Sequence, residues 1–509
     1  MDRTEHGAHR EKQLPRNITI RFWGLLIAMV LAIVLSSTVT AQEQQTHRMA
    51  ITTTSEEARA LYLQARQYQE MSQPESARPL LEKALDLDPT FAMALDALRS
   101  VAPTFKASRE VLARLQEVLE TASLSEGEQL HFEALQAALA GDREHQREIL
   151  ESMVEQFPDD ERIRYRLALF HFGNDDQQAA EILTEVTRLN PAFVPAYNTL
   201  GYSLRSLGRE EDAERAFQTA IDLNPDNPNA YDSYAELLLS QGRHEASIAY
   251  YEETLAREPL FPSAQIGVAA NLILLNRHAE ARRRLDTLFQ IAPHDGIRSG
   301  VHWAKAVTYV DEGHMDLALA ELEKNLALSQ KADDRAAVAL DLTNIATCLI
   351  EQGDIEKVHP KLALALEHRL TIPGASDIQK SFAQFNHLYM TGRAHVADGT
   401  LTEAEVALDQ LGTLAEQLDT RFAHERVHEL KGILALAQND YATAIDEIEQ
   451  ADANEVYNLY RLAHAYEGLG NTRRAADYYA WVVGYNSPLN LNYSFVRHKA
   501  KARLDALRG

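Results

Sequence analysis

Residues 424–428 have the residue types and the spacing that metal chemistry requires. His424, Glu425 and His428 form the pattern H-E-x-x-H. In a helix, two histidines four residues apart lie on one face, where they can bind Zn²⁺, and the glutamate beside them can act as a general base. The pattern therefore indicates a zinc metallopeptidase as one hypothesis for this chain.

The remaining parts of such a zinc site are missing from the sequence. Zinc enzymes of this kind need a third protein ligand, but Lys431 and Leu434 stand where the longer metzincin pattern has glycine and histidine. Glu447 and Glu449 follow later, on what we expect to be the next helix. With 19 histidines in the chain, one match to so short a pattern also arises by chance. We therefore predict no metal, no cofactor and no catalytic residue, and keep the metallopeptidase as an alternative.

Composition and charge argue against several other classes of protein. The sequence has neither a phosphate-binding glycine loop nor a G-x-S-x-G nucleophile. Its formal net charge of −25 disfavours nucleic-acid binding, which needs a cationic surface. Cys348 is the only cysteine, so no intramolecular disulfide forms. With 45% hydrophobic residues and only 22 glycines and 16 prolines in 509 residues, the composition favours an all-α globular fold.

The N-terminal 41 residues form a candidate targeting segment. A cationic stretch precedes an apolar run from Phe22 to Leu35, and Val39 and Ala41 suit cleavage before Gln42. These are the parts of a secretory signal peptide. The alternative is an uncleaved membrane anchor, because about 20 residues are enough to cross a bilayer. We favour cleavage.

Both predictions for residues 1–41 place the rest of the chain on the far side of the cytoplasmic membrane. The protein is then expected in the periplasm or elsewhere in the cell envelope. It would contact the membrane only through residues 18–41, and only if the segment stays uncleaved. Residues 42–54 are rich in Gln and Thr and are predicted to be a polar spacer.

Prolines recur through the middle of the chain at a fixed interval. Pro191, Pro225, Pro259 and Pro293 are each 34 residues apart. A fixed period of this length is typical of a repeated helical hairpin, in which two short helices and a turn form each unit. Proline ends each second helix, because it lacks an N–H and clashes with the preceding turn.

The clearest copy of the repeat is residues 194–227. Small residues let its two helices approach closely, and larger apolar residues fill the space around them. Gly208 is expected to end the first helix in a left-handed conformation. The residues with a packing or terminating role are Tyr197, Leu200, Gly201, Leu204, Ala213, Phe217, Ala220 and Pro225. This pattern resembles the tetratricopeptide repeat, a family with Trp or Tyr, Leu, Gly, Tyr, Ala, Phe, Ala and Pro at these places.

The resemblance covers nearly all of residues 55–490 and implies a solenoid. We predict an all-α fold, a right-handed α-α superhelix of about 11–12 helical hairpins. An N-terminal array is expected at 55–295, and a more degenerate array at 296–490. Residues 491–509 are predicted to form a capping helix that covers the last apolar face.

In this family the first helix of each hairpin lines a concave groove, which implies a binding surface for protein segments. The register of the repeat nominates the residues between the packing positions. In the N-terminal array they are Asn198, Tyr202, Arg205, Asp232, Glu236, Ile266 and Ile273. In the C-terminal array they are Tyr389, Arg393, Tyr457, Tyr460, His464 and Glu467. Aromatic anchors with polar edges suit an extended segment or a helix of another protein.

The resemblance implies binding rather than catalysis, because the repeats leave no room for a catalytic domain. We predict an exported bacterial scaffold or adaptor that binds one or more proteins in the cell envelope, with no nucleic-acid partner and no enzymatic activity. A structural solenoid that assembles with itself is the other alternative, beside the metallopeptidase.

Overall fold

The chain folds into a continuous series of antiparallel helix pairs. The structure is a computed structural model that describes residues 47–452, 455–487 and 489–509. Within these ranges it has 25 α-helices, one short 3₁₀ turn and no strand. Twelve successive hairpins are followed by one further helix, so the predicted all-α solenoid of about 11–12 hairpins with a final helix is confirmed.

The N-terminal hairpins have mostly short helices. They are α2 (Glu56–Glu70) with α3 (Pro74–Leu87), α4 (Ala92–Ser100) with α5 (Phe105–Leu119), α6 (Glu126–Ala140) with α7 (Arg143–Gln156), α8 (Glu161–His171) with α9 (Asp176–Leu189), α10 (Val194–Ser206) with α11 (Glu210–Leu223), α12 (Pro228–Ser240) with α13 (His244–Arg257), and α14 (Pro262–Leu274) with α15 (His278–Ile291).

Longer helices explain why the period of 34 is lost beyond residue 295. Helix α20 has 22 residues and α18 has 18, against 13 in α10. The C-terminal elements are α16 (Asp295–Asp311) with α17 (Met315–Lys331), α18 (Arg335–Gln352) with η1 (Ile355–Lys357) and α19 (Val358–Leu370), α20 (Asp377–Asp398) with α21 (Leu401–Leu418), α22 (Arg421–Ala437) with α23 (Tyr441–Ile448), α24 (Val456–Gly468) with α25 (Thr472–Val483), and α26 (Leu491–Arg508).

Gly201 shows why the repeat needs a small residue on its first helix. A Cβ atom built on Gly201 would lie 2.6–2.8 Å from three ring carbons of Phe217 on α11. The rings and methyl groups around this contact are buried, with Ala213, Phe217 and Ala220 fully inaccessible to solvent. Gly208 ends α10 at φ +70°, as predicted from its place in the sequence.

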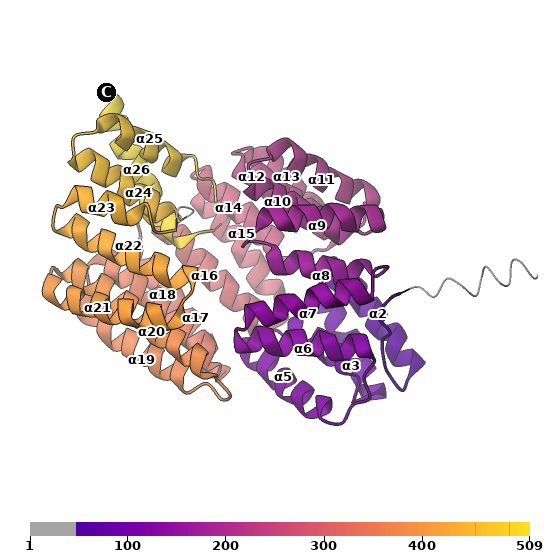
Figure 1. The fold of residues 1–509 in the computed structure, drawn as a ribbon. Helices are drawn as coiled ribbons and strands as arrows, with labels where there is room; N and C mark the ends of the chain where they lie inside the picture. Colours follow the sequence, from indigo (N-terminus) through magenta and orange to yellow (C-terminus); the bar gives the residue numbers. More distant parts are fainter. Residues whose placement is uncertain (1–46, 453–454, 488) are drawn as a thin grey trace, which may run out of the picture.

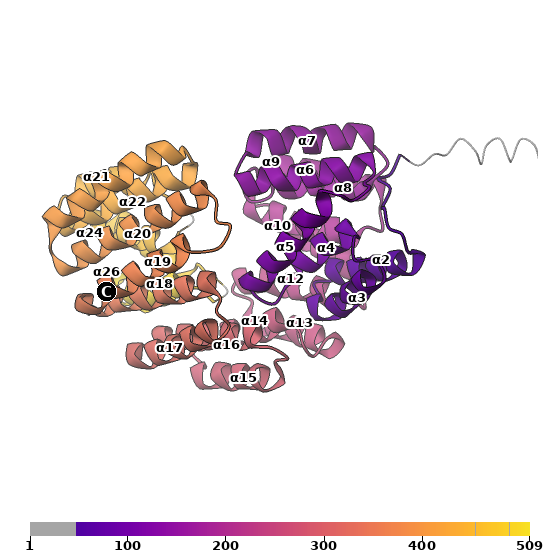
Figure 2. The ribbon, with the colours of Figure 1, turned by 90° about the horizontal axis from the view of Figure 1, so that it is seen from below.

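The helices form two lobes that lie side by side, one with most of the N-terminal hairpins and one with most of the C-terminal hairpins, and α14 to α17 join them (Figures 1 and 2). The solenoid curves far enough for α5 to contact α18. Here the backbone N–H of Lys106 donates to Asp334 at 2.7 Å. Nearby, His294 at the start of α16 lies 3.0 Å from Glu75 on α3.

The last helix, α26, packs in two directions at once. It lies against α24 and α25, as a cap would (Figure 1), and it also contacts α16 in the middle of the chain. Phe495, Val496, Ala500 and Leu504 form the apolar stripe of this helix and are buried. The helix therefore fastens the end of the C-terminal array to its beginning.

The described part of the predicted spacer, residues 47–54, is neither helix nor strand and is hydrogen-bonded to the repeats. Thr52 donates its N–H to Glu128 at 2.7 Å, and Thr54 donates to Asp88 at 2.8 Å. The signal or anchor predicted at 1–41 lies outside the described residues. Among the described helices, none is long and apolar enough to cross a membrane.

Candidate binding cavity of the C-terminal repeats

The first helices of the hairpins form the inner, concave side of each array. Helices α10, α12, α14 and α16 contact one another in succession, and so do α18, α20, α22, α24 and α26, whereas the second helices are farther apart. The side chains nominated for the groove lie on these first helices. The structure brings them together in two groups, one in each array.

In the N-terminal array, the nominated side chains contact one another. The Tyr202 hydroxyl donates to Glu236 at 3.1 Å, and Arg205 pairs with the same carboxylate at 3.0 Å. Asp232 is buried and accepts a hydrogen bond from Ser263 at 3.2 Å. Burial, together with the charge of Glu236, raises the pKa of Asp232 to about 7.

The other three nominated side chains of this array differ in exposure. Asn198 is half-buried, and its Oδ1 has no hydrogen-bond donor among the described residues. Ile266 is half-buried, and Ile273 is 3% exposed. The backbone oxygen of Ile273 accepts from Arg497 of α26 at 3.3 Å. The end of α14 is thus covered by the chain's own last helix.

In the C-terminal array, the nominated residues belong to an internal network of charges and tyrosines. The Tyr457 hydroxyl donates to Glu351 at 2.7 Å, and Arg393 lies 3.9 Å from the same carboxylate. Tyr389 is buried and receives a hydrogen bond from Arg426 at 3.2 Å. These contacts link α18, α20, α22 and α24. They join three nominated side chains to Glu351 and Arg426, which the repeat register did not nominate.

Glu429 on α22 is at the centre of this network, and no sequence pattern singles it out. It is 3% exposed and accepts from Arg461 at 2.7 Å and also from Arg426. Burial opposes its negative charge, but Arg461, Arg426 and Arg393 hold the pKa of Glu429 at about 2. A carboxylate that stays charged inside the solenoid fixes the arginines around it.

The remaining nominated residues lie on α24, toward the end of the array. Tyr460 packs against Tyr457 and Tyr479, with ring centroids 6.1 and 5.8 Å apart. Glu467 accepts a hydrogen bond from Tyr479 at 2.9 Å and from Arg503 of α26 at 3.1 Å. His464 is exposed. The other nominated residues of α24, Tyr457, Tyr460 and Glu467, all contact side chains of the protein itself.

A cavity of about 490 Å³ opens on the concave side of the C-terminal array. Helices α18, α19, α20 and α22 form most of its wall, and residues 489–492 before and at the start of α26 close one side. Tyr389 and Arg393, both nominated from the sequence, line it together with Arg426. Its size is that of a pocket for a small ligand or a short piece of peptide.

The cavity combines apolar surface with cationic and amide groups. Leu340 and Phe422, each 43% exposed, contribute apolar surface, and Asn344 and Asn386 contribute amides. Three arginines reach its wall: Arg369, Arg393 and Arg426. Among the described residues that line it, none is Asp or Glu. Sequence reasoning missed Arg369, because it lies at the end of a second helix rather than on a first helix.

The H-E-x-x-H segment does not gather three metal ligands. His424 Nε2 lies 3.5 Å from Asp419, whereas His428 Nδ1 meets Glu447 of α23 at 2.7 Å. Glu425 pairs with Arg421 at 2.7 Å. Within the described residues, these side chains are held by separate polar contacts on α22, and no third ligand joins the two histidines.

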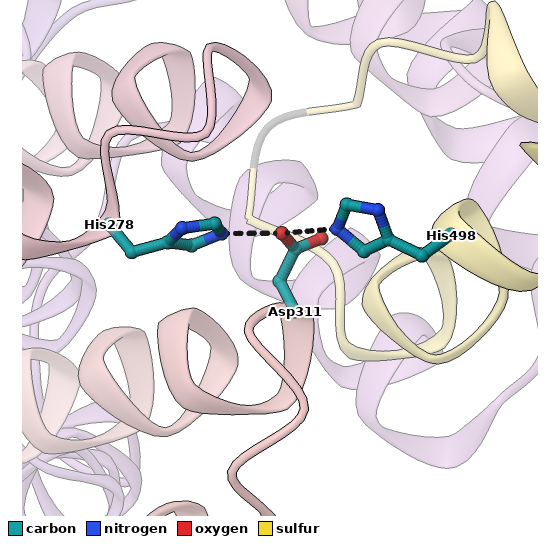
Figure 3. Close-up of side chains that lie close together, drawn as sticks. All are labelled: His278, Asp311 and His498. Carbon is teal, nitrogen blue, oxygen red and sulfur yellow. Dashed lines mark hydrogen bonds and ion pairs between the residues drawn. The ribbon is translucent and has the colours of Figure 1, made fainter.

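A different group of possible ligands, His278, Asp311 and His498, comes together where α26 meets α15 and α16. Figure 3 shows the two histidines on opposite sides of the Asp311 carboxylate. His278 Nε2 lies 2.8 Å from Asp311 Oδ2, and His498 Nε2 lies 3.2 Å from the same oxygen. No local sequence pattern indicates this group, because Asp311 lies 33 residues from His278 and 187 residues from His498 in the chain.

The protein's own cation already occupies the centre of that group. Arg497 donates through Nε to Asp311 Oδ1 at 2.9 Å and through a terminal nitrogen to Oδ2 at 2.5 Å. The same nitrogen lies 3.0 Å from His498 Nε2, where a metal ion would have to sit. Burial opposes the charge of Asp311, but its contacts with His278, His498 and Arg497 hold its pKa well below the usual range. The arrangement fits an ion-pair anchor for α26 better than a metal site.

Comparison with known proteins identifies the repeat. Three family models described as tetratricopeptide repeat match the chain, one at 58–91, one at 173–228 and 198–264, and one at 238–298. No curated protein sequence gives a significant match.

Several solved structures are similar to parts of the chain. A tetratricopeptide repeat protein from Parabacteroides merdae is 17% identical, with 47% of this chain and 98% of that one covered and a TM-score of 0.33. A thermophilic TPR protein of Thermus thermophilus is 18% identical, with 37% and 98% covered and a TM-score of 0.31. The pilF protein of Pseudomonas aeruginosa is 19% identical, with 44% and 92% covered and a TM-score of 0.31.

Proposed function

Since this chain carries tetratricopeptide repeats, we propose that it is a non-enzymatic scaffold that binds a segment of a partner protein in the cavity of its C-terminal array. Repeats of this kind support a role in protein–protein interaction. The observation that carries the proposal is the cavity itself. It opens on the concave side, contains exposed apolar and polar groups, and stays open although α26 fills the neighbouring surface.

We further propose that this scaffold acts outside the cytoplasm. The support is the sequence of residues 1–41, with its cationic stretch, apolar run and small residues before Gln42. An exported scaffold would meet its partner in the cell envelope. Without a catalytic domain among the repeats, its contribution would be to hold that partner in place.

The test is a cross-linked pull-down of tagged protein from its own cell envelope, with and without a blocked cavity. Asn386→Trp places a large side chain in the cavity from the exposed side of α20. Gln384→Trp, exposed on the same helix but outside the cavity, is the matched control. One stoichiometric partner that is lost with Asn386→Trp and kept with Gln384→Trp supports the proposal. A partner retained by both variants would place binding elsewhere.

A further inference from the structure

The cavity of the C-terminal array is a concentration of positive charge in a protein whose formal net charge is −25. Three arginines line it, Arg369, Arg393 and Arg426, and none of the described residues that line it is Asp or Glu. Two further cations, Arg461 and Lys499, do not line the cavity and pair with Glu429 and Glu351.

Both carboxylates are already used inside the network. Glu429 accepts from Arg426 and Arg461, and Glu351 accepts from Tyr457 and faces Lys499 at 3.5 Å. Neither carboxylate lines the cavity. The arginines at the cavity wall therefore carry more positive charge than these two carboxylates balance.

Arg369 is the cation with the least compensation. It is half-buried at the end of α19, and among the described residues no carboxylate lies within ion-pair distance of it. Burial and the nearby charge of Arg109 lower its pKa, with Asp334 acting in the opposite direction. Asp334 is engaged elsewhere, by the N–H groups of Lys106 and Ala336 and by Arg109 at 3.6 Å. A desolvated guanidinium without a partner favours an anion brought by a ligand.

The amide and apolar side chains that line the cavity indicate which kind of molecule could carry that anion. Asn344 and Asn386 can donate to oxygen, and Asn492 lies in the first turn of α26, where free N–H groups favour negative charge. Leu340 and Phe422 offer exposed apolar surface beside these groups. The wall thus provides donors for carboxylate oxygens and a surface for an apolar side chain in one cavity.

We infer that the cavity recognises an acidic segment of the partner protein, in which carboxylates face Arg369 and Arg393 and an apolar side chain packs on Phe422 and Leu340. The inference rests on the proposed binding function and specifies its ligand. Charge attraction would draw such a segment toward this cationic cavity in an otherwise acidic chain.

Fluorescence anisotropy with short dye-labelled peptides tests this inference on the purified full chain. The probe is a peptide in which Glu alternates with Leu, and its partner is the same peptide with Gln in place of Glu. The Glu peptide is expected to bind at least about tenfold more tightly, and its affinity is expected to fall as salt is added. Arg369→Gln should remove most of that difference. Arg421→Gln, an exposed arginine of α22 outside the cavity, should leave it unchanged.

The outcomes separate the inference from the proposed function. Equal binding of both peptides would overturn the acidic ligand and leave the cavity as a binding site. Absence of saturable binding of the Glu peptide, or an unaltered Glu preference in Arg369→Gln, would also overturn the inference. The proposed function itself is decided by the pull-down with Asn386→Trp, which does not depend on the charge of any peptide.

Discussion

Arg497 and Asp311 form a two-point ion pair across 186 residues of sequence. Asp311 is 4% exposed. The Arg497 guanidinium also donates to the backbone oxygens of Ile273 and Leu274 at 3.3 Å. One side chain of the last helix thus satisfies acceptors at the ends of two earlier helices. This is why α26 is held against the middle of the solenoid rather than only capping its end.

Replacing Arg497 should release α26 from α16. Arg497→Met leaves Asp311 buried with only the histidines beside it, and breaking a buried pair in this way costs about 3 kcal/mol. We expect faster hydrogen exchange in α26 and a lower unfolding temperature. Lys501→Met removes an exposed pair with Asp505 on the same helix, and it should change stability by less than about 1 kcal/mol. Equal effects of the two substitutions would show that Arg497 does not anchor the helix.

Gly201→Ala should destabilise the N-terminal array. The new methyl group would meet the Phe217 ring, and overpacking of this kind costs about 1–3 kcal/mol. Gly412→Ala is the control, since a Cβ there meets nothing within 4 Å and alanine is the better helix former in α21. Denaturant unfolding should therefore move in opposite directions for the two variants. A neutral Gly201→Ala would contradict the steric argument for the repeat.

Asp232 should make the protein less stable as the pH rises. Its pKa in the folded state is about 7, above its ordinary value of 3.8. Between pH 3.8 and pH 7 the folded protein therefore keeps a proton on Asp232 that the unfolded chain has released. The stability contribution is therefore greatest below about pH 4 and is lost as the pH rises through 7. Asp232→Asn removes the buried charge, and at pH 8 it should raise the free energy of unfolding by more than about 1 kcal/mol.

Exposed Asp226 provides the control for that titration. Asp226→Asn should leave the pH dependence of the unfolding temperature as it is in the unaltered protein. If Asp232→Asn gives the same increase at pH 5 as at pH 8, the effect comes from packing and not from the charge of the carboxylate.

The H-E-x-x-H segment should not hold zinc. His424→Ala is expected to leave the metal content of the purified protein unchanged, because His424 and His428 contact different partners. Elemental analysis of both proteins after exposure to Zn²⁺ checks this. About one zinc per chain that disappears with His424→Ala would restore the metallopeptidase hypothesis.

Mass spectrometry of the mature protein should find Gln42 as its first residue. The reason is the arrangement of small residues at Val39 and Ala41 after a short apolar run. A chain that starts at Met1 and remains in the membrane fraction would instead favour the uncleaved anchor.

The sequence by itself determined the helical hairpin and its packing. The period of 34 residues, the glycine at 208 and the small residue at 201 act within one repeat, so local sterics and helix termination are enough to specify them. The apolar stripe of α26 was equally visible, because it follows from the helical period alone. The same period nominates one face of the first helices, and its role in binding a partner stays a prediction.

Only the tertiary structure decided what that face does. Tyr457 reaches Glu351 across 106 residues, Arg497 reaches Asp311 across 186, and Arg369 enters the cavity from a second helix. These meetings depend on how tightly the solenoid curves, which is the sum of small angles between many helix pairs. The residue pattern of a single repeat does not specify the total curvature. The repeat therefore specifies the unit, and the curvature specifies which units meet to form the charged network and the cavity.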